Sequence, residues 1–262
     1  MGRSEDLARI QQALYAVAEL VRSGMPERAA IHYKAGGDPV TELDRSLNEM
    51  LYRLLPRNGE GWLSEETADD LSRLERHRVW VVDPVDGTRE FLAGIPEWCV
   101  SIALIEEGRP VAGGICNPVT GETVCGALGM GVFYNGRPVC VSECWTLWGA
   151  TVLASRTEVA RGEWERFRDA PFRIRPVGSV AYKLALVASG RADATFSVCS
   201  KNEWDIAAGA LLVEAAGGQV TDRWGRPLRF NRHNTIVEGI IAGSALLVHE
   251  IQKLVQDSMA QR

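Results

Sequence analysis

A chain of 262 residues with 46% apolar content is long enough to bury the core of one large domain or of two closely packed subdomains. Its net charge of −5 forms no Lys/Arg stripe, which argues against a nucleic-acid polymer as partner, and no apolar stretch approaches the ~20 residues that cross a bilayer. The first residues lack the pattern of a signal peptide and the six cysteines show no C-x-x-C pair, so we expect a cytoplasmic protein with reduced cysteines.

The first half of the chain predicts helices followed by antiparallel strands. Apolar residues at helical spacing predict helices over residues 5–23 and 42–55, and a third is expected over 68–77. Between the first two lies HYKAGGDPVTELD, whose glycines, proline and polar residues predict a mobile loop. The β-branched run VWVV, residues 79–82, predicts a buried central strand that ends at Asp83.

Two hairpins are then expected. The stretch 100–118 should turn at Glu107-Gly108, and VFYNGRPVCV should turn at Asn135-Gly136, a pair that favours the tight turn of a hairpin. Strands and helices alternate after about residue 148. Strands are predicted in TVLAS, DATFSV and GIIAGS, and helices in VAYKLALVASG, 205–218 and 244–257. We therefore expect an α/β (α+β) protein with an N-terminal α+β subdomain, 1–148, and a tightly packed C-terminal α/β subdomain, 149–262.

The stretch DPVDGTREF follows the predicted buried strand directly. Its acids, Asp83 and Asp86, could belong to an ordinary Asp/Pro/Gly turn. That reading is the weaker one, because an ionised carboxylate at the end of a buried strand is costly unless a cation or several donors hold it.

Three other acidic places have equally simple explanations. Asp205, in NEWDIAAG, would make a good helix N-cap. Asp44 follows Thr41 at the spacing of a capping box. Glu65 and Glu66, in SEET, could be solvated acids.

A functional reading arises if Glu65, Asp83, Asp86 and Asp205 converge. Four carboxylates within a few ångströms would raise one another's pKa values, so only a hard cation makes sense of them. Oxygen ligands without histidine or cysteine select Mg²⁺ or Mn²⁺ over zinc. The Gly-Thr that follows could offer backbone N–H groups to a phosphate, so the sequence predicts a site that binds metal and phosphate together.

These motifs, taken together, resemble those of the inositol monophosphatase superfamily of Mg²⁺-dependent, lithium-sensitive phosphatases. The resemblance lies in SEET, WVVDPVDGTREF and EWDIAAGALLVEAAGG, in that order, and extends over nearly the whole chain. It implies a layered αβαβα sandwich, usually a homodimer, that hydrolyses a small phosphorylated metabolite. It also implies direct in-line attack by a metal-activated water, without a phospho-enzyme.

The resemblance also implies roles for individual residues. Glu65, Asp83 and the carbonyl of Val85 would hold a first metal ion, and Asp83, Asp86 and Asp205 a second. A third, weaker ion would lie near Glu65.

Catalysis and phosphate binding would involve the turn after these acids. Thr88, paired with Asp44 from the loop, would help Glu65 to activate the water. The backbone amides of Gly87 and Thr88 would receive the phosphate.

Within the superfamily, several residues resemble the bacterial 3′(2′),5′-bisphosphate nucleotidases. Arg89-Glu90 and Glu203 fit that branch, and Val198 stands where inositol enzymes have a glutamate that grips sugar hydroxyls. Adenosine 3′,5′-bisphosphate is therefore the expected substrate. The expected substrate wall comprises Gly178, Ser179, Lys183 and Glu203. Lys183 could hold a second phosphate as a point charge, or be a solvated helix lysine.

Three alternatives stay open at this point. The first is inositol-1-monophosphatase or fructose-1,6-bisphosphatase activity in the same superfamily. The second is a phosphatase with a covalent aspartyl-phosphate, although its D-x-D-x-T spacing differs by one residue here. The third is a non-catalytic phosphate-binding protein, which a set of four carboxylates disfavours.

Overall fold

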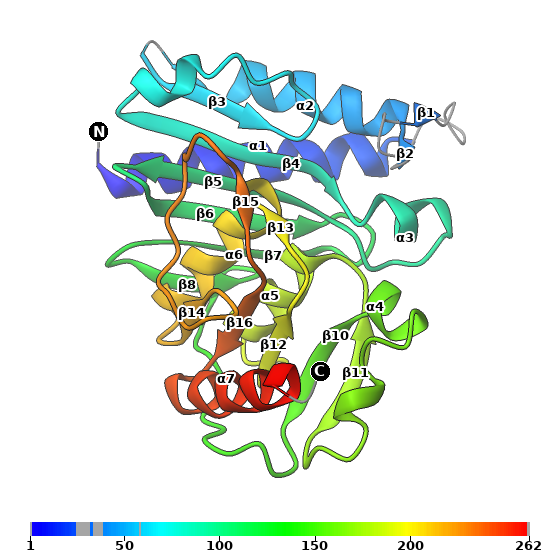
Figure 1. The fold of residues 1–262 in the computed structure, drawn as a ribbon. Helices are drawn as coiled ribbons and strands as arrows, with labels where there is room; N and C mark the ends of the chain where they lie inside the picture. The colour runs from blue at the N-terminus through cyan, green and yellow to red at the C-terminus, as the bar shows by residue number, and fades with distance from the viewer. Residues whose placement is uncertain (1, 25–31, 34–38, 58, 261–262) are drawn as a thin grey trace.

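The computed structural model describes residues 2–24, 32–33, 39–57 and 59–260. Two sheets form its frame (Figure 1). The larger runs in the order β3 (Gly61–Ser64), β4 (Arg78–Asp86), β5 (Cys99–Glu106), β6 (Arg109–Asn117), β7 (Glu122–Ala127), β8 (Gly131–Tyr134) and β9 (Arg137–Val139). Strands β3 and β4 are parallel, and the other neighbours are antiparallel.

The second sheet is mixed. It runs in the order β11 (Arg173–Val177), β10 (Thr151–Ser155), β12 (Ala194–Ser197), β16 (Ile240–Gly243) and β14 (Gln219–Thr221). Strand β10 is parallel to β11 and β12, whereas β16 is antiparallel to both of its neighbours. Two short antiparallel pairs complete the strands: β1 (His32–Tyr33) with β2 (Pro39–Val40), and β13 (Lys201–Asn202) with β15 (Ile236–Val237).

The helices separate and cover these sheets. They are α1 (Arg3–Arg22), α2 (Glu42–Leu54), α3 (Thr88–Leu92), α4 (Arg156–Ala160), α5 (Val180–Ala188), α6 (Glu203–Ala215) and α7 (Ala245–Ala260), with 3₁₀ turns at Ser72–Glu75 and Glu165–Phe167. Helices α1 and α2 cover the outer face of the larger sheet, α5 and α6 lie between the sheets, and α7 covers the second sheet (Figure 1). This is the predicted αβαβα sandwich.

Strand β4 shows why its sequence is continuously apolar. Trp80 and Val82 point into the cluster formed with α1 and α2, whereas Val79 and Val81 point into the cluster formed with α5 and α6. Side chains alternate between the two faces of a strand, so a strand covered on both faces needs apolar residues at successive positions. Burial on both faces fixes the register of β4 and therefore the place where its acidic end emerges.

The contact between α5 and α6 is close enough to require a glycine. A Cβ added at Gly209 of α6 would lie 2.4 Å from the Cβ of Leu184 on α5. We expect Gly209→Ala to lower the free energy of unfolding by about 1–3 kcal/mol through overpacking, despite alanine's better helix propensity. Urea unfolding would measure this change. In the Leu184→Gly background, which removes the contacting Cβ together with the rest of the side chain, the same substitution should cost less; an equal cost in both backgrounds would contradict the steric explanation.

Most predicted elements are present, including both hairpins with their turns at Glu107-Gly108 and Asn135-Gly136. The helix predicted over 68–77 is wrong, because only Ser72–Glu75 forms a short 3₁₀ turn. The side chains of Asp69 and Asp70 accept hydrogen bonds from backbone N–H groups two residues on, which competes with an α-helix.

Other expectations concern the loop, the cysteines and the division of the chain. Positions 34–38 of the predicted mobile loop lie outside the described residues. All six cysteines are free, but only Cys99, Cys116 and Cys125 are buried; Cys144 and Cys199 are half-buried and Cys140 is exposed. The two sheets lie on either side of residue 148 in sequence, and the division there stays a proposal. None of the helices in the described ranges is both long and apolar enough to span a membrane.

Candidate active site

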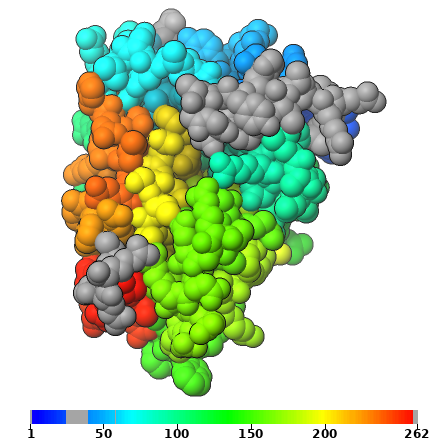
Figure 2. Space-filling model, turned by 45° about the vertical axis from the view of Figure 1, so that its right-hand side comes forward, coloured from blue at the N-terminus to red at the C-terminus, as the bar shows by residue number. Residues whose placement is uncertain are grey.

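A cavity of about 270 Å³ lies at the acidic end of β4. Residues from both the N-terminal and the C-terminal half of the chain line it. It is lined by Glu65, Asp83, Val85, Asp86, Gly87, Thr88, Arg89, Glu90, Ser155, Thr157, Ser179, Val180, Lys183, Lys201, Asn202 and Asp205. On the face shown in Figure 2, segments near residues 90, 160 and 200, in teal, green and yellow, lie next to one another.

A larger cavity of about 410 Å³ lies beside α2 and β3. Two of its carboxylates, Glu60 and Asp69, are ion-paired with Arg9 and Arg73. These two acids therefore already have cationic partners.

An irregularity in β4 brings Asp83 and Asp86 together. The strand does not end at Asp83, as its sequence predicts, but continues to Asp86. Asp83 pairs with Ser101 and Asp86 with Cys99, so three steps along β4 oppose two along β5. Residues three apart on a regular strand point to opposite faces. The extra residue of this bulge-like irregularity lets both carboxylates reach one cavity.

Glu65, Asp83 and Asp205 form the closest acidic group. Each offers a carboxylate oxygen, and these oxygens all lie within 4.8 Å of one another. Burial raises the pKa of Asp83 well above its usual value, and repulsion from Glu65, Asp86 and Asp205 raises it further. Burial and the charge of Asp86 likewise raise the pKa of Asp205 well above its usual value. The protein alone does not stabilise these charges.

Asp86 lies beside this group but has donors of its own. Its Oδ2 accepts hydrogen bonds from Ser179 Oγ at 2.5 Å and from the Ala181 amide at 2.6 Å. Burial still raises its pKa above the usual value, against these hydrogen bonds and the attraction of Lys183. Two donors thus hold one oxygen of Asp86, and its second oxygen, Oδ1, is available to another partner.

The donor set fits a hard divalent cation. The group consists of carboxylate oxygens from β4, the start of α6 and the segment after β3, with no imidazole or thiol among them. Mg²⁺ and Mn²⁺ favour such ligands. Neutralising converging buried carboxylates relieves the repulsion that raises their pKa values.

The predicted pair of Thr88 and Asp44 is present in the structure. Thr88 Oγ1 lies 3.5 Å from Asp44 Oδ1 and 3.1 Å from the carbonyl oxygen of Val85. Asp44 also forms the capping box of α2 with Thr41, so its structural role coexists with the Thr88 contact. Asp44 belongs to the first turn of α2 and not to the preceding loop.

Gly87 is required where β4 turns into α3. Its φ of 99° lies in the left-handed region, and an added Cβ would lie 3.1 Å from the Glu97 carbonyl oxygen. A side chain is therefore excluded both by backbone conformation and by space. This glycine places the Thr88 backbone at the edge of the cavity, next to the acids.

The predicted substrate wall is only partly at the cavity. Ser179 lines it, whereas Gly178 lies behind it and donates its amide to Glu97 Oε2 at 2.8 Å. Lys183 also lines it but is only 3% exposed, so it is not a solvated helix lysine. Its Nζ donates to the carbonyl oxygens of Ser179 at 2.8 Å and Val177 at 3.4 Å, and burial lowers its pKa to about 8.

Glu203 is placed away from the cavity, contrary to expectation. Its side chain is fully buried, and its carboxylate accepts hydrogen bonds from the Asn231 amide at 2.6 Å and the Arg232 amide at 3.1 Å. Its role in the structure is to hold the segment that leads to β15. Asp205, expected as an N-cap, instead occupies the third position of α6 in a capping box with Asn202.

We expect Glu203→Ala to destabilise the protein by about 1–3 kcal/mol, because it leaves the backbone N–H groups of Asn231 and Arg232 without their hydrogen-bond acceptor. Thermal or urea unfolding would measure the loss. An unchanged stability together with a raised KM would contradict the structural role and restore Glu203 to the substrate wall.

The sequence analysis missed five residues of the cavity: Ser155, Thr157, Val180, Lys201 and Asn202. Ser155 and Thr157 come from the start of α4, for which the sequence gives no strong helical period. Lys201 and Asn202 stand four and three positions before Asp205. Because only about one helical turn separates them from a predicted metal ligand, this spacing could have predicted that they line the same cavity.

Comparisons with known proteins agree with this geometry. The sequence model of the inositol monophosphatase family matches residues 3–259. An inositol-1-monophosphatase from Mesorhizobium japonicum is 34% identical over 273 residues, covering 100% of both chains. A fructose-1,6-bisphosphatase/inositol-1-monophosphatase from Thermotoga maritima is 33% identical over 223 residues, covering 84% of this chain and 83% of the relative.

Solved structures extend the similarity to the fold. The crystal structure of the extragenic suppressor protein suhB from Bartonella henselae superposes with a TM-score of 0.80 at 31% identity, covering 96% of this chain and 98% of that one. A family match over nearly the whole sequence, with the same fold at similar length, shows that the chain belongs to the inositol monophosphatase family, whose members are metal-dependent phosphatases.

Proposed function

We propose that the chain hydrolyses a phosphomonoester of a small metabolite in the cavity at the end of β4, with Mg²⁺ as the cofactor and Mn²⁺ as a substitute. One observation carries this proposal: oxygens of Glu65, Asp83 and Asp205 gather within 4.8 Å, next to the turn at Gly87 and Thr88. Carboxylates alone repel a phosphate, so this arrangement suits phosphate chemistry when cations are bound among them.

The proposed ligand assignment follows the family resemblance. Glu65, Asp83 and the carbonyl of Val85 hold one ion, and Asp83, Asp86 and Asp205 hold a second, with a third near Glu65. When bound, such ions lower the pKa of a water and offset the charge that develops on phosphate oxygens.

The chain's own groups orient the reactants. The Thr88 hydroxyl lies between Val85 and Asp44, where it can hold a nucleophilic water in line with phosphorus. Burial raises the pKa of Asp44 above its usual value, so this carboxyl is suited to share a proton with Thr88. The backbone N–H groups of Gly87 and Thr88 bind the phosphate. Solvent then donates the proton that the oxygen of the leaving group takes up.

The identity of the leaving group is the finer part of the proposal. Arg89 and Glu90 line the cavity and favour the expected adenosine 3′,5′-bisphosphate. Glu203 no longer supports that choice, because its carboxylate is occupied elsewhere. The names of the similar proteins favour a second candidate, inositol 1-phosphate or fructose 1,6-bisphosphate.

Phosphate release from these three substrates would test the proposal, each measured with Mg²⁺, with EDTA, and with Mg²⁺ plus Li⁺. For at least one substrate, we expect phosphate release that requires Mg²⁺ and is inhibited by millimolar Li⁺. Tight binding of a phosphorylated ligand without any release would favour a non-catalytic binding protein. Covalent capture of phosphate on Asp83 would favour an aspartyl-phosphate mechanism.

We also propose, from the sequence and the family resemblance, a cytoplasmic homodimer that acts on small molecules and has neither nucleic acid nor membrane as a partner. Light scattering of the purified protein would test the dimer. A mass close to that of one 28.7 kDa chain at micromolar concentration would contradict it.

A further inference from the structure

Lys201 has an ammonium group that the proposed mechanism does not use. It lies on β13, directly before α6, and its side chain lines the cavity with 17% of its surface exposed. Within the described residues its hydrogen bond and its ion pair both go to Glu158, whose Oε1 is 3.2 Å from Nζ. An ammonium has three N–H donors, so two of them are left for water or a ligand.

Glu158 is built to hold that ammonium in place. It is a buried residue of α4, and its carboxylate also accepts hydrogen bonds from Trp164 Nε1 at 3.1 Å and Ser197 Oγ at 2.5 Å. Although burial opposes it, attraction by Lys201 and these hydrogen bonds lower the pKa of Glu158 below its usual value. Glu158 is therefore ionised, and its fixed position fixes that of Lys201.

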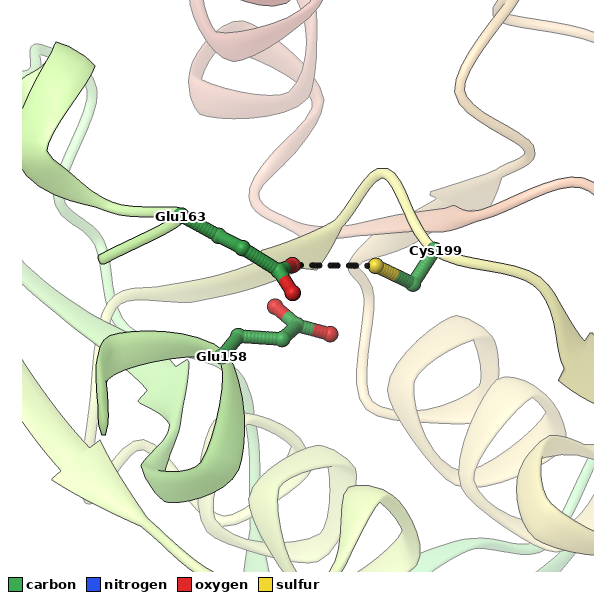
Figure 3. A group of neighbouring side chains, drawn as sticks. All are labelled: Glu158, Glu163 and Cys199. Carbon is green, nitrogen blue, oxygen red and sulfur yellow. Dashed lines mark hydrogen bonds between the residues drawn. The ribbon is translucent and has the colours of Figure 1, made fainter. Parts of the chain in front are cut away.

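A second carboxylate, that of Glu163, lies next to Glu158. Figure 3 shows Glu163 beside Glu158, with Cys199 across from it; Cys199 Sγ lies 3.2 Å from Glu163 Oε2. Two neighbouring carboxylates favour a cation next to them. Glu163 thus adds negative charge next to the carboxylate that pairs with Lys201.

The two lysines of the cavity differ in what they can offer to a ligand. Lys183 is nearly inaccessible and gives two N–H groups to backbone carbonyls. Lys201 keeps two donors, and hydroxyls of Ser155 and Thr157 line the same cavity. Ser155 Oγ accepts from the Glu158 amide, which leaves its O–H free to donate. An ammonium with neighbouring hydroxyl donors suits the oxygens of an anion.

We propose that Lys201, held by Glu158, is a specificity-determining residue that binds a second anionic group of the substrate, such as a second phosphate. This inference rests on the proposed phosphatase function, because it assumes that the scissile phosphate lies at Gly87 and Thr88 in the same cavity. It selects metabolites with two anionic groups over those with one.

The test compares matched substrates that share the scissile phosphate. The pairs are fructose 1,6-bisphosphate with fructose 1-phosphate, and adenosine 3′,5′-bisphosphate with adenosine 3′-monophosphate. The wild type should favour the bisphosphate of at least one pair. Lys201→Met should lower the ratio of bisphosphate to monophosphate kcat/KM by about 10- to 100-fold, mainly through KM. Lys201→Arg should retain part of the preference, and Lys253→Met, at an exposed position of α7, is the matched control.

Lys201→Met leaves Glu158 without its cation, so Lys201→Met/Glu158→Gln is measured as well, since it removes both charges together. We expect the same fall in the ratio. An equal loss on both members of each pair would overturn the proposal, because Lys201 would then act on the scissile phosphate. An unchanged ratio, or a wild type without preference for bisphosphates, would also overturn it. If the wild type releases phosphate neither from these substrates nor from inositol 1-phosphate, the proposed function itself fails; activity on inositol 1-phosphate alone would overturn only the role of Lys201.

Discussion

Asp83→Asn is expected to lower kcat for Mg²⁺-dependent phosphate release by at least about 10²–10³-fold, because it removes a carboxylate that both proposed ions share. Asparagine has nearly the same shape and can still accept the hydrogen bond that the Val85 amide donates at 3.0 Å. The fold should therefore persist. Steady-state kinetics with a substrate that the wild type turns over would measure the loss.

The same substitution should stabilise the metal-free protein. Burial and three neighbouring carboxylates raise the pKa of Asp83 well above its usual value, so its ionised form opposes folding at neutral pH. Removing that charge should raise the melting temperature in EDTA by about 2–4 °C for each kcal/mol relieved. Asp169→Asn, at a side chain 96% exposed, is the control and should change neither quantity. An active or an unfolded Asp83→Asn would refute this explanation.

The stability of the metal-free protein should fall as pH rises from about 5 to 8. The pKa values of Asp83 and Asp205 are both raised well above their usual value in the folded state. The folded protein therefore binds more protons than the unfolded chain, in which aspartate titrates near ~3.9. Their contribution to stability is then complete only below the unfolded pKa of ~3.9, and it is lost as pH rises from there through the raised folded pKa values. Melting temperatures in EDTA across this range would measure the slope.

Excess Mg²⁺ should remove most of that slope. Metal binding to the folded state alone adds about 2.7 kcal/mol of stability at one hundred times the dissociation constant, and it competes with protons for the same carboxylates. The prediction applies above about pH 5. At more acidic pH, protonation of Glu60 and Glu106, whose pKa values are lowered in the folded state, destabilises the protein, so that stability there falls as pH falls. A stability in EDTA that rises with pH would contradict the account. So would a pH dependence that stays the same when excess Mg²⁺ replaces EDTA.

Local signals made much of the fold predictable. The continuous apolar run of β4 indicated a strand buried on both faces, and Asn135-Gly136 indicated a tight turn whose two residues have φ values of 46° and 77°. The capping box of Thr41 and Asp44 depends on residues three apart and was likewise readable. Such features depend on neighbours in sequence, so the sequence alone contains them.

Features that depend on distant contacts were not predictable. The irregularity that brings Asp83 and Asp86 to one cavity is a matter of pairing with β5. Glu203 fits a family motif, yet its carboxylate is used by the segment at Asn231 and Arg232, about thirty residues later in the chain. The orientation of Lys201 depends on Glu158 of α4, which the sequence does not connect with it.

The central claim is that carboxylates from distant segments form one cation site, and anomalous diffraction from crystals grown with Mn²⁺ tests it most directly. We predict at least one anomalous peak within bonding distance of oxygens from Glu65 and Asp83, with Asp205 beside it. Peaks that lie elsewhere, or ordered crystals whose three side chains point apart with no ion among them, would contradict it.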